Sequence, residues 1–268
     1  MEQVSASNIE QFQRDGAICL RQVISQNWLL LLAKGTEKAL ACPGPFHHIQ
    51  SKNDDPGGFF TEYYLARRIC EFHRFVREGP IAAIAGNLTN TDQIRFFFDG
   101  LFVKEPETEK ISQWHQDQPY YPINGNQVTV IWIPLDHVDH TECLTILRGS
   151  HLTGKWYQPV LFRDDQDLHS RNPQYEIIPH MDTMPKADLL SWDMSPGDCI
   201  AFHGLSLHGA SGNPTKHRRR ALSTTWLGTD TKFHTRPDIL EPHFANLSYP
   251  EDSPLNDEKE FPLVWERQ

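Results

Sequence analysis

The sequence of 268 residues predicts a mainly β fold with flanking α-helices, in which the helices pack outside a two-sheet jelly roll. Helix signals occupy the first third of the chain. From residue 93 the pattern changes to short segments rich in β-branched and aromatic residues. Turn sequences such as Asn124-Gly125-Asn126 and Pro196-Gly197-Asp198 separate these segments, without a linker or an internal repeat. We expect strands over residues 93–103, 127–135, 142–147, 198–203 and 218–226.

The helical part begins with a capping-box pattern at Ser7, and Gly16 is a suitable stop for the short helix that follows. Residues 17–21 then have the composition of a short strand. Ser25 is a candidate cap for a second helix, which runs towards Pro43.

Residues 44–60 contain Pro, Gly, Asn and Asp and predict a long surface loop, whereas residues 62–86 alternate charged and apolar positions at helical spacing. The tail is rich in Pro, Asp and Glu, which indicates a surface segment. We therefore expect a single domain over residues 1–268, with a mostly helical part (1–90), a jelly-roll core (91–230) and a C-terminal segment that wraps the surface (231–268).

Composition and charge limit the classes of molecule that the protein is expected to bind. The formal charge of −10 argues against nucleic acid, and the basic run 217–220 falls on a predicted strand, where only alternate side chains share a face. The sequence has no apolar run near the roughly 20 residues of a membrane helix, and its start lacks signal-peptide features. We expect a cytoplasmic protein that acts on a small molecule, with five reduced cysteines; nothing indicates an oligomeric state.

A candidate metal site combines His115, Asp117 and His208. Two imidazoles and one carboxylate are the ligands that hold non-haem Fe(II) on one face and leave the opposite positions open. The triplet His-x-Asp alone is weak, because 14 histidines in 268 residues give roughly one such triplet by chance. Context must choose among three: His115/Asp117, His137/Asp139 and His180/Asp182.

Strand geometry favours the first triplet. Residues two apart on a strand face the same way, so His115 and Asp117 are expected to point together into the mouth of the barrel. The triplet at His180 follows a proline and indicates a loop, and the one at His137 indicates a solvated strand end. His203 and His208 are both candidates for the third ligand position. Because they are five residues apart, they lie on opposite faces of a regular strand, so at most one of them points inward.

A cation follows the last histidine. On the predicted strand, Arg219 shares a face with the small residues Ala221 and Ser223, which leaves room for a ligand beside it. A guanidinium there would suit the far carboxylate of a small diacid cosubstrate. An ordinary surface cation is the alternative interpretation of this arginine.

A series of segments between about residues 95 and 228 occurs in the order typical of one enzyme family. They are Trp114-His115-Gln116-Asp117 with Tyr120-Tyr121-Pro122, Val130-Ile131-Trp132-Ile133-Pro134-Leu135, Arg148-Gly149-Ser150-His151, Pro196-Gly197-Asp198, Phe202-His203 through Leu207-His208-Gly209, and Arg219. Together they resemble the phytanoyl-CoA dioxygenase family, which includes ectoine hydroxylase-like enzymes. The resemblance implies a double-stranded β-helix, a cupin-like jelly roll, with Fe(II) as cofactor and 2-oxoglutarate and O2 as cosubstrates.

Carried over by position, the resemblance implies that His115, Asp117 and His208 bind iron and that Arg219 holds the distal carboxylate of 2-oxoglutarate. Related halogenases have a small residue in place of the aspartate. The presence of Asp117 therefore favours hydroxylation or another oxidation.

Other positions concern the cosubstrate pocket. Trp132 matches a family position that lines it, with an ordinary core tryptophan as the alternative. Ala210 stands where some members have a serine that contacts 2-oxoglutarate, so Ser211 or a water is expected to take over that contact. A second departure is Glu105 after Lys104, where a proline is common.

The candidate substrate-contacting residues are Lys104, Gln113, Tyr120 and Tyr121, and the candidate aromatic walls are Phe96, Phe98, Phe102 and Trp156. Core packing is the alternative role for these aromatic residues. Aromatic rings in an acidic chain would tolerate a cationic substrate through cation–π contact. The sequence shows no basic patch of the kind that would bind a CoA thioester. We therefore expect the substrate to be a small free metabolite.

The sequence thus predicts an Fe(II)- and 2-oxoglutarate-dependent dioxygenase that hydroxylates a small molecule with release of succinate and CO2. One alternative is a jelly-roll metalloenzyme of another class, an isomerase or a hydrolase, which would need no Arg219. The other is a non-catalytic metabolite-binding jelly roll, in which the histidines are structural and bind no iron.

Overall fold

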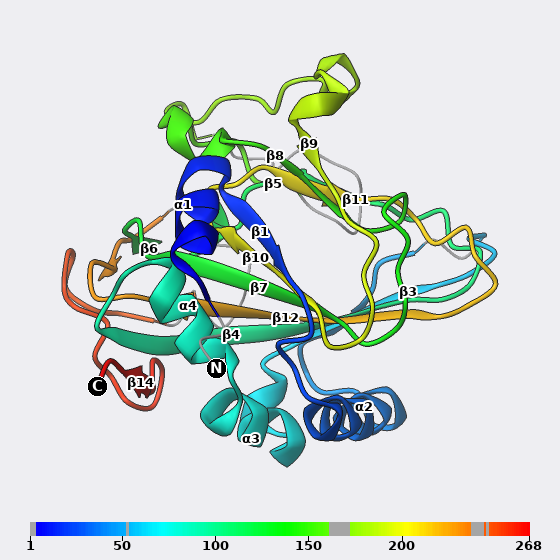
Figure 1. The fold of residues 1–268 in the computed structure, drawn as a ribbon, viewed down its shortest axis with the longest axis horizontal. Coiled ribbons are helices and arrows are strands. Elements are labelled where there is room, and N and C mark those ends of the chain that lie inside the picture. Colours follow the sequence, from blue (N-terminus) through cyan, green and yellow to red (C-terminus); the bar gives the residue numbers. More distant parts are fainter. Residues whose placement is uncertain (1–3, 52–53, 161–171, 237–243, 245–246) are drawn as a thin grey trace.

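The computed structural model describes residues 4–51, 54–160, 172–236, 244 and 247–268. Two β-sheets face each other, and helices cover the outer face of the larger one (Figure 1). This arrangement confirms the mainly β jelly-roll class, with helices packed outside the sheets.

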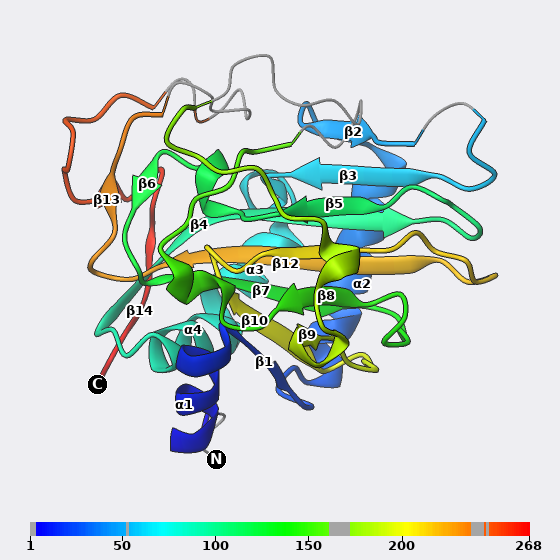
Figure 2. The same cartoon turned by 90° about the horizontal axis from the view of Figure 1, so that it is seen from above.

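The main sheet is antiparallel throughout and has the order β1-β10-β7-β12-β4-β3-β2, with β14 pairing to the start of β4. Figure 2 shows β2 and β3 at one edge of this sheet and β1 at the other. The strands are β1 (Ala17–Leu20), β2 (His47–Ile49), β3 (Phe59–Tyr63), β4 (Gln93–Lys104), β7 (Val128–Pro134), β10 (Cys199–His203), β12 (Arg219–Leu227) and β14 (Leu263–Glu266).

The smaller sheet has the order β5-β11-β8-β9 and lies across the inner face of the main sheet (Figure 1). A separate pair, β6 with β13, extends the structure at one end. The bounds are β5 (Ser112–His115), β6 (Ile123–Asn124), β8 (Leu144–Leu147), β9 (Leu189–Leu190), β11 (His208–Ala210) and β13 (Lys232–Phe233).

Alternation along the strands divides the main sheet into two faces. One face carries Leu222 and Trp226, which pack with residues such as Phe72 and Phe75 from the helices in the largest core cluster. Burial of each such aromatic side chain contributes roughly 1.5–3 kcal/mol. The helices of the chain are α1 (Ala6–Asp15), α2 (Gln26–Ala41), α3 (Cys70–Glu78) and α4 (Ile81–Leu88), and its short 3-10 turns are η1 (Leu65–Arg67), η2 (Gln118–Tyr120), η3 (Ser150–Thr153), η4 (Met181–Thr183) and η5 (Lys186–Asp188).

Helix ends differ in one respect from the sequence expectation. The capping box of α1 is formed by Ser5 and Asn8, so the prediction of Ser7 as the cap was wrong. Asn8 replaces the usual Glu or Gln because its short amide also reaches the cap backbone. Gly16 ends α1 in the left-handed conformation with φ 77°, as predicted, and α2 begins after Ser25.

The five predicted strand regions are confirmed, and the observed ends lie within two residues of the predicted ones. Two other regions differ. The stretch predicted as the loop 44–60 contains β2 and the start of β3, which extend the main sheet. The tail contributes β14 to the same sheet, and its aromatic residues Phe244 and Phe261 pack against Phe97.

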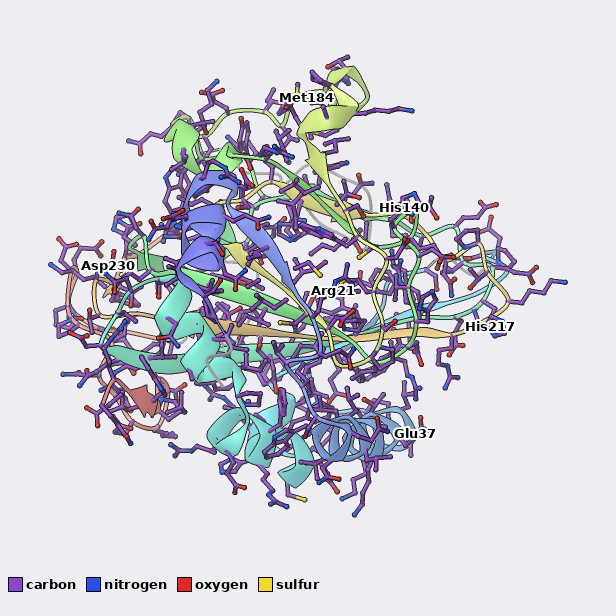
Figure 3. All side chains as sticks on the ribbon, in the orientation of Figure 1. Arg21, Glu37, His140, Met184, His217 and Asp230 are labelled. Carbon is purple, nitrogen blue, oxygen red and sulfur yellow. The ribbon has the colours of Figure 1, made fainter. Side chains whose placement is uncertain are left out.

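The arginines of the basic run 217–220 point to alternate faces of the sheet, as the strand alternation predicts. Arg219 points inward, whereas Arg218 and Arg220 point outward, where Arg218 pairs with Glu105 at 2.7 Å. Arg220 pairs with Glu37 of α2 at 3.1 Å, and Figure 3 shows Glu37 on that helix. Among the described residues, no helix is long and apolar enough to cross a membrane.

Candidate metal centre and its cavity

Three side chains that are distant in sequence meet between the sheets. His115 ends β5 and His208 begins β11, and the two residues are direct partners across this antiparallel pair. Their ring centroids lie 4.1 Å apart. With Asp117 they place three possible ligand atoms within 4.8 Å of one another, the only such group of three or more His, Cys, Asp or Glu side chains among the described residues.

Hydrogen bonds orient both imidazoles towards the carboxylate. The Nδ1 atom of His115 lies 2.7 Å from the carbonyl of Gln113, and that of His208 lies 2.9 Å from the carbonyl of Ser206. A carbonyl only accepts, so Nδ1 carries the hydrogen in each ring and Nε2 keeps its lone pair. These Nε2 atoms lie 3.2 Å and 3.6 Å from Oδ1 of Asp117.

The electrostatics favour the ligand forms of His208 and Asp117. Burial, together with the nearby His115, lowers the pKa of His208 to about 4, so its ring is neutral at neutral pH. Burial opposes ionisation of Asp117, but His208 and His115 outweigh it and lower the pKa of this carboxyl. A neutral imidazole and an ionised carboxylate are the states that bind a metal.

The expectation that Asp117 lies on the same strand face as His115 was wrong. Strand β5 ends at His115, and Asp117 adopts right-handed helical dihedrals of φ −77° and ψ −42° as the chain turns into η2. It therefore does not share a strand face with His115, because the chain has already left the sheet. Its backbone N–H donates to the carbonyl of Gly204 at 3.1 Å, which fixes the turn against the segment that leads to His208.

The side chain of Gln116 anchors the same turn. Its amide Nε2 donates to the carbonyl of Leu205 at 2.8 Å, and its Oε1 accepts from the N–H of Tyr157 at 2.9 Å. The side chain is buried, so these bonds are shielded from water. Gln116 thus positions its two neighbours in the sequence, His115 and Asp117, a role that the sequence analysis did not assign.

A cavity of about 370 Å³ opens beside the three side chains, between the two sheets. Its floor is the inner face of the main sheet, and the other wall comes from β5, β8 and β11. The floor residues are Phe59, Thr61 and Tyr63 on β3, Phe98, Gly100, Phe102 and Lys104 on β4, Arg219, Ala221, Ser223 and Thr225 on β12, Trp132 on β7 and Phe202 on β10.

Two cations lie side by side in this floor. Arg219 and Lys104 are direct partners across β12 and β4. The carbonyl of Ser211 accepts from both, at 2.6 Å from Lys104 Nζ and 3.4 Å from Arg219. Arg219 also donates to the carbonyl of Glu142, and Lys104 lies over the ring of Phe59 at 4.6 Å.

Neither cation has a carboxylate partner within ion-pair distance in the described part of the chain, where Asp117 is the one carboxylate that lines the cavity. Burial lowers the pKa of Arg219 to about 10. Burial, and then repulsion from Arg219, lowers the pKa of Lys104 to about 6. Arg219 is therefore charged in the unliganded cavity, whereas Lys104 is largely uncharged at neutral pH and gains a proton when an anionic ligand binds beside it.

The other histidines considered from the sequence lie elsewhere. His137 and Asp139 are more than 60% exposed, and His180 is exposed at the start of η4; the side chain of Asp182 is outside the described set. His203 is buried but accepts from the N–H of Leu205 and does not line the cavity. Figure 3 labels His140 and His217, which are exposed, and His140 pairs with Asp193.

The remaining predicted site residues divide between cavity and surroundings. Trp132, Tyr120 and Tyr121 line the cavity with Lys104, although the Tyr120 hydroxyl is bonded to both the N–H and the carbonyl of Val160. Gln113 contributes its carbonyl to the orientation of His115, and its side chain does not line the cavity.

The hydroxyl of Ser211 donates to the carbonyl of Thr141 and does not face the cavity; its carbonyl is what contacts the two cations. Ala210 itself lines the cavity. The geometry therefore does not support the expectation that the Ser211 hydroxyl takes over the contact that some family members make through a serine in place of Ala210. Phe98 and Phe102 are walls, as expected, whereas Phe96 packs on Trp226 and Trp156 stacks on Tyr175.

Sequence reasoning missed the part of the cavity formed by β2 and β3. His48, Gln50, Phe59, Thr61 and Tyr63 line it there, inside the stretch predicted as a loop and its continuation. The alternation of Phe59, Thr61 and Tyr63 was a detectable strand signal, but the preceding Pro and Gly residues outweighed it.

Comparison with known proteins identifies the family. Residues 12–221 match the family model described as phytanoyl-CoA dioxygenase (PhyH). The chain belongs to the phytanoyl-CoA dioxygenase family. The matched region contains the three candidate metal ligands and Arg219.

Curated members of the family match over shorter segments. The peroxisomal phytanoyl-CoA dioxygenase of Rattus norvegicus is 26% identical over 130 residues, which cover 44% of this chain and 34% of that protein. The Homo sapiens enzyme is 25% identical over 130 residues with the same coverage. The match thus spans about a third of the length of these relatives.

Solved structures match over nearly the whole chain. The non-heme alpha ketoglutarate dependent carbocyclase SnoK from nogalamycin biosynthesis has a TM-score of 0.76 and 22% identity, with 98% of each chain covered. EctD from S. alaskensis, solved with 2-oxoglutarate and 5-hydroxyectoine, has a TM-score of 0.70 and 17% identity, with 93% of this chain and 86% of that chain covered. At these identities the similarity establishes the shared fold.

Proposed function

We propose that this protein is an Fe(II)- and 2-oxoglutarate-dependent dioxygenase that oxidises a small molecule, in the first place by hydroxylation, with release of succinate and CO2. The observation that carries the proposal is the joint presence, around one cavity, of the His115/Asp117/His208 cluster and of buried cations without carboxylate partners among the described residues. The first part suits a metal, and the second part suits a dianionic cosubstrate.

The donor set fits ferrous iron. Two imidazoles and one carboxylate are a donor set that would suit non-haem Fe(II) and leave coordination positions for other ligands. The hydrogen bonds at Nδ1 of His115 and His208 fix the ring planes, and the ligand atoms are already close together. The three side chains are therefore preorganised for a single ion.

The cationic floor fits 2-oxoglutarate. When the keto-acid end of this dianion binds beside Asp117, its far carboxylate needs a cation, and Arg219 offers a planar set of N–H donors. Arg219 is buried, so a carboxylate that binds it would be shielded from water. Lys104, held beside Arg219 by the Ser211 carbonyl, adds a second positive charge once a bound carboxylate raises its pKa.

Iron with 2-oxoglutarate and O2 supplies an oxidant that can remove hydrogen from a C–H bond, while the protein contributes binding and orientation. Within this chain, His115, Asp117 and His208 hold the ion, and Arg219 orients the cosubstrate. The apolar walls, including Phe102 and Trp132, exclude water from the reaction space. The negative charge of Asp117 occupies the position that a halide would need, which favours hydroxylation over halogenation.

An anaerobic titration tests this proposal. Addition of Fe(II) and then 2-oxoglutarate should produce a weak visible charge-transfer band, and O2 should then release succinate. The variant His115→Gln should lose the band, whereas His137→Gln, in an exposed triplet of the same type, should keep it. A wild-type protein that shows neither a band nor succinate release would contradict the proposal and favour another class of jelly-roll metalloenzyme or a binding protein.

The substrate is a separate matter. The relatives of known sequence are phytanoyl-CoA dioxygenases, and proteins of the same fold include a nogalamycin carbocyclase and a protein solved with 5-hydroxyectoine, so the fold alone does not specify a substrate. A free metabolite rather than a CoA thioester, a cytoplasmic location and the lack of nucleic-acid partners remain predictions from the sequence.

A further inference from the structure

The cavity extends from the metal centre to the β2–β3 edge, where its walls are mainly aromatic. Phe59 and Phe102 lie with ring centroids 6.4 Å apart, and Tyr63 lies 6.1 Å from Phe102 and 6.2 Å from Phe98. These rings come from neighbouring strands of the main sheet, so their positions are fixed by the strand register. The apolar surface that they present to the cavity suits an apolar, ring-containing molecule.

One polar pair, formed by Gln50 and Thr61, interrupts this aromatic wall. The two residues are 6% and 1% exposed, and Nε2 of Gln50 lies 3.1 Å from Oγ1 of Thr61. Oε1 of Gln50 is buried and has no hydrogen-bond partner in the described part of the chain. Buried polar atoms in proteins are nearly always paired, so an unpaired one on a side chain that lines a cavity points to a ligand.

The backbone holds this pair in place. The N–H of Gln50 donates to the carbonyl of Phe59 at 2.7 Å, and the N–H of Phe59 donates to the Ser51 hydroxyl at 3.2 Å. Thr61 lies within β3 and pairs with Phe102 of β4. Both polar side chains are therefore positioned before any ligand arrives.

The pair can both accept and donate hydrogen bonds. When Nε2 donates to Thr61, Oε1 of Gln50 remains as an acceptor and the Thr61 hydroxyl hydrogen remains as a donor. When the amide is turned over, the Thr61 hydroxyl donates to Oε1 and Nε2 keeps its hydrogens for the cavity. A ligand hydroxyl matches the pair in either orientation, because it also donates and accepts.

Charge restricts the ligand further. The described lining residues include one carboxylate, Asp117, at the metal centre, and two cations, Lys104 and Arg219. A cationic substrate would meet these cations without a free counter-charge, contrary to the cation–π expectation from the sequence. An anionic substrate would compete with 2-oxoglutarate for the same cations.

We propose that Gln50 and Thr61 form a substrate-binding subsite that recognises a hydroxyl group on an uncharged, ring-containing substrate whose body packs against Phe59, Tyr63 and Phe102. This inference rests on the proposed function, because it places the substrate beside an iron and 2-oxoglutarate centre. It assigns a substrate class, a hydroxylated carbocyclic or aromatic molecule, which the family membership does not specify.

Equilibrium dialysis with matched probes tests the subsite. The protein, loaded anaerobically with Fe(II) and 2-oxoglutarate, is dialysed against 2-naphthol, naphthalene, 2-naphthoate and 2-naphthylmethylammonium. We expect 2-naphthol to bind about 3- to 10-fold more tightly than naphthalene, as for one to two net hydrogen bonds. The two charged probes should bind more weakly than 2-naphthol. The proposal is overturned if the wild-type protein shows no preference for 2-naphthol over naphthalene, including no binding of either, or prefers a charged probe.

Variants of Gln50 and Thr61 test whether these two side chains cause the preference for 2-naphthol over naphthalene. Gln50→Leu and the nearly isosteric Thr61→Val should each reduce the preference for 2-naphthol over naphthalene and leave the affinity for naphthalene within about twofold. Phe102→Leu is the matched control, since it removes apolar contact and should weaken both probes by the same factor. A preference that survives both Gln50→Leu and Thr61→Val overturns the assignment.

The charge-transfer titration separates this test from the proposed function. Gln50→Leu and Thr61→Val should bind 2-oxoglutarate as the wild-type protein does, which also shows that they fold. A normal band with unselective probe binding would refute the subsite alone. Absence of the band in the wild-type protein would refute the proposed function itself.

Discussion

Replacement of Arg219 by methionine should separate the stability of the protein from its affinity for the cosubstrate. Arg219 is 7% exposed and donates to two backbone carbonyls, but it has no carboxylate partner within ion-pair distance among the described residues. Its charge is therefore held in the cavity at a cost to the unliganded protein. That cost is recovered when a carboxylate binds.

The structure gives the magnitude of both effects. Burial lowers the pKa of Arg219 from 12.5 to about 10. At about 1.4 kcal/mol for each pKa unit, the unliganded protein carries roughly 3 kcal/mol of unfavourable free energy. Arg219→Met removes this cost but also removes two hydrogen bonds worth about 1 kcal/mol each, so the free energy of unfolding should change little.

Affinity should change far more. Loss of one partner from a buried charge pair costs about 3–5 kcal/mol, which corresponds to roughly 100- to 4,000-fold weaker binding of 2-oxoglutarate. The anaerobic charge-transfer titration measures the dissociation constant, and thermal unfolding without ligand measures stability. Arg218→Met is the matched control, because this neighbouring arginine is exposed and makes a surface ion pair of small value.

Two results would refute this reasoning. A dissociation constant for 2-oxoglutarate within about threefold of the wild-type value would show that Arg219 does not bind its carboxylate. A large loss of stability in the unliganded variant would show that Arg219 is a structural residue, held by its two carbonyl partners.

Other predictions concern the second cation, the metal ligands and the tail. Because the unliganded pKa of Lys104 is about 6 and a bound carboxylate raises it, binding of 2-oxoglutarate takes up a proton above pH 6. Its affinity should then fall by up to about tenfold per pH unit from pH 6 to 8, and Lys104→Met should abolish this slope in titrations with iron saturating. Asp117→Ala and His208→Ala should each weaken Fe(II) binding by at least about 100-fold, measured by competition with a chelator. Gly86→Ala would place a Cβ 2.2 Å from Cζ3 of Trp265 and should destabilise the protein by roughly 1–3 kcal/mol in urea unfolding.

Controls accompany these predictions. Gly58→Ala is the counterpart of Gly86→Ala, because its added Cβ meets nothing closer than 3.7 Å and should have little effect. An unchanged pH slope in Lys104→Met would remove Lys104 from the cosubstrate site. Full iron affinity in Asp117→Ala would remove the carboxylate from the ligand set.

Strand periodicity explains why the sequence predicted most of the core. On β12 the alternation places Arg219, Ala221 and Ser223 on the cavity face, and Leu222 and Trp226 among the helices. A sheet covered on both faces imposes this separation, so parity alone predicts which side chains enter the cavity.

Features that depend on tertiary contacts were not predicted. Asp117 reaches the metal centre through a turn anchored on Gly204, and no local pattern encodes that contact. Strand β14 pairs with β4 from the far end of the chain, although its sequence resembles a surface tail. Gln50 enters the cavity because the hairpin β2–β3 closes beside β4, which the preceding loop-forming residues obscured.

A crystal structure of the protein with Mn(II) and 2-oxoglutarate, grown without O2, would test the central claim most directly. We predict one metal ion bound by His115 Nε2, His208 Nε2 and a carboxylate oxygen of Asp117. The far carboxylate of 2-oxoglutarate should contact the guanidinium of Arg219. A metal bound elsewhere, or 2-oxoglutarate that does not contact Arg219, would contradict this account.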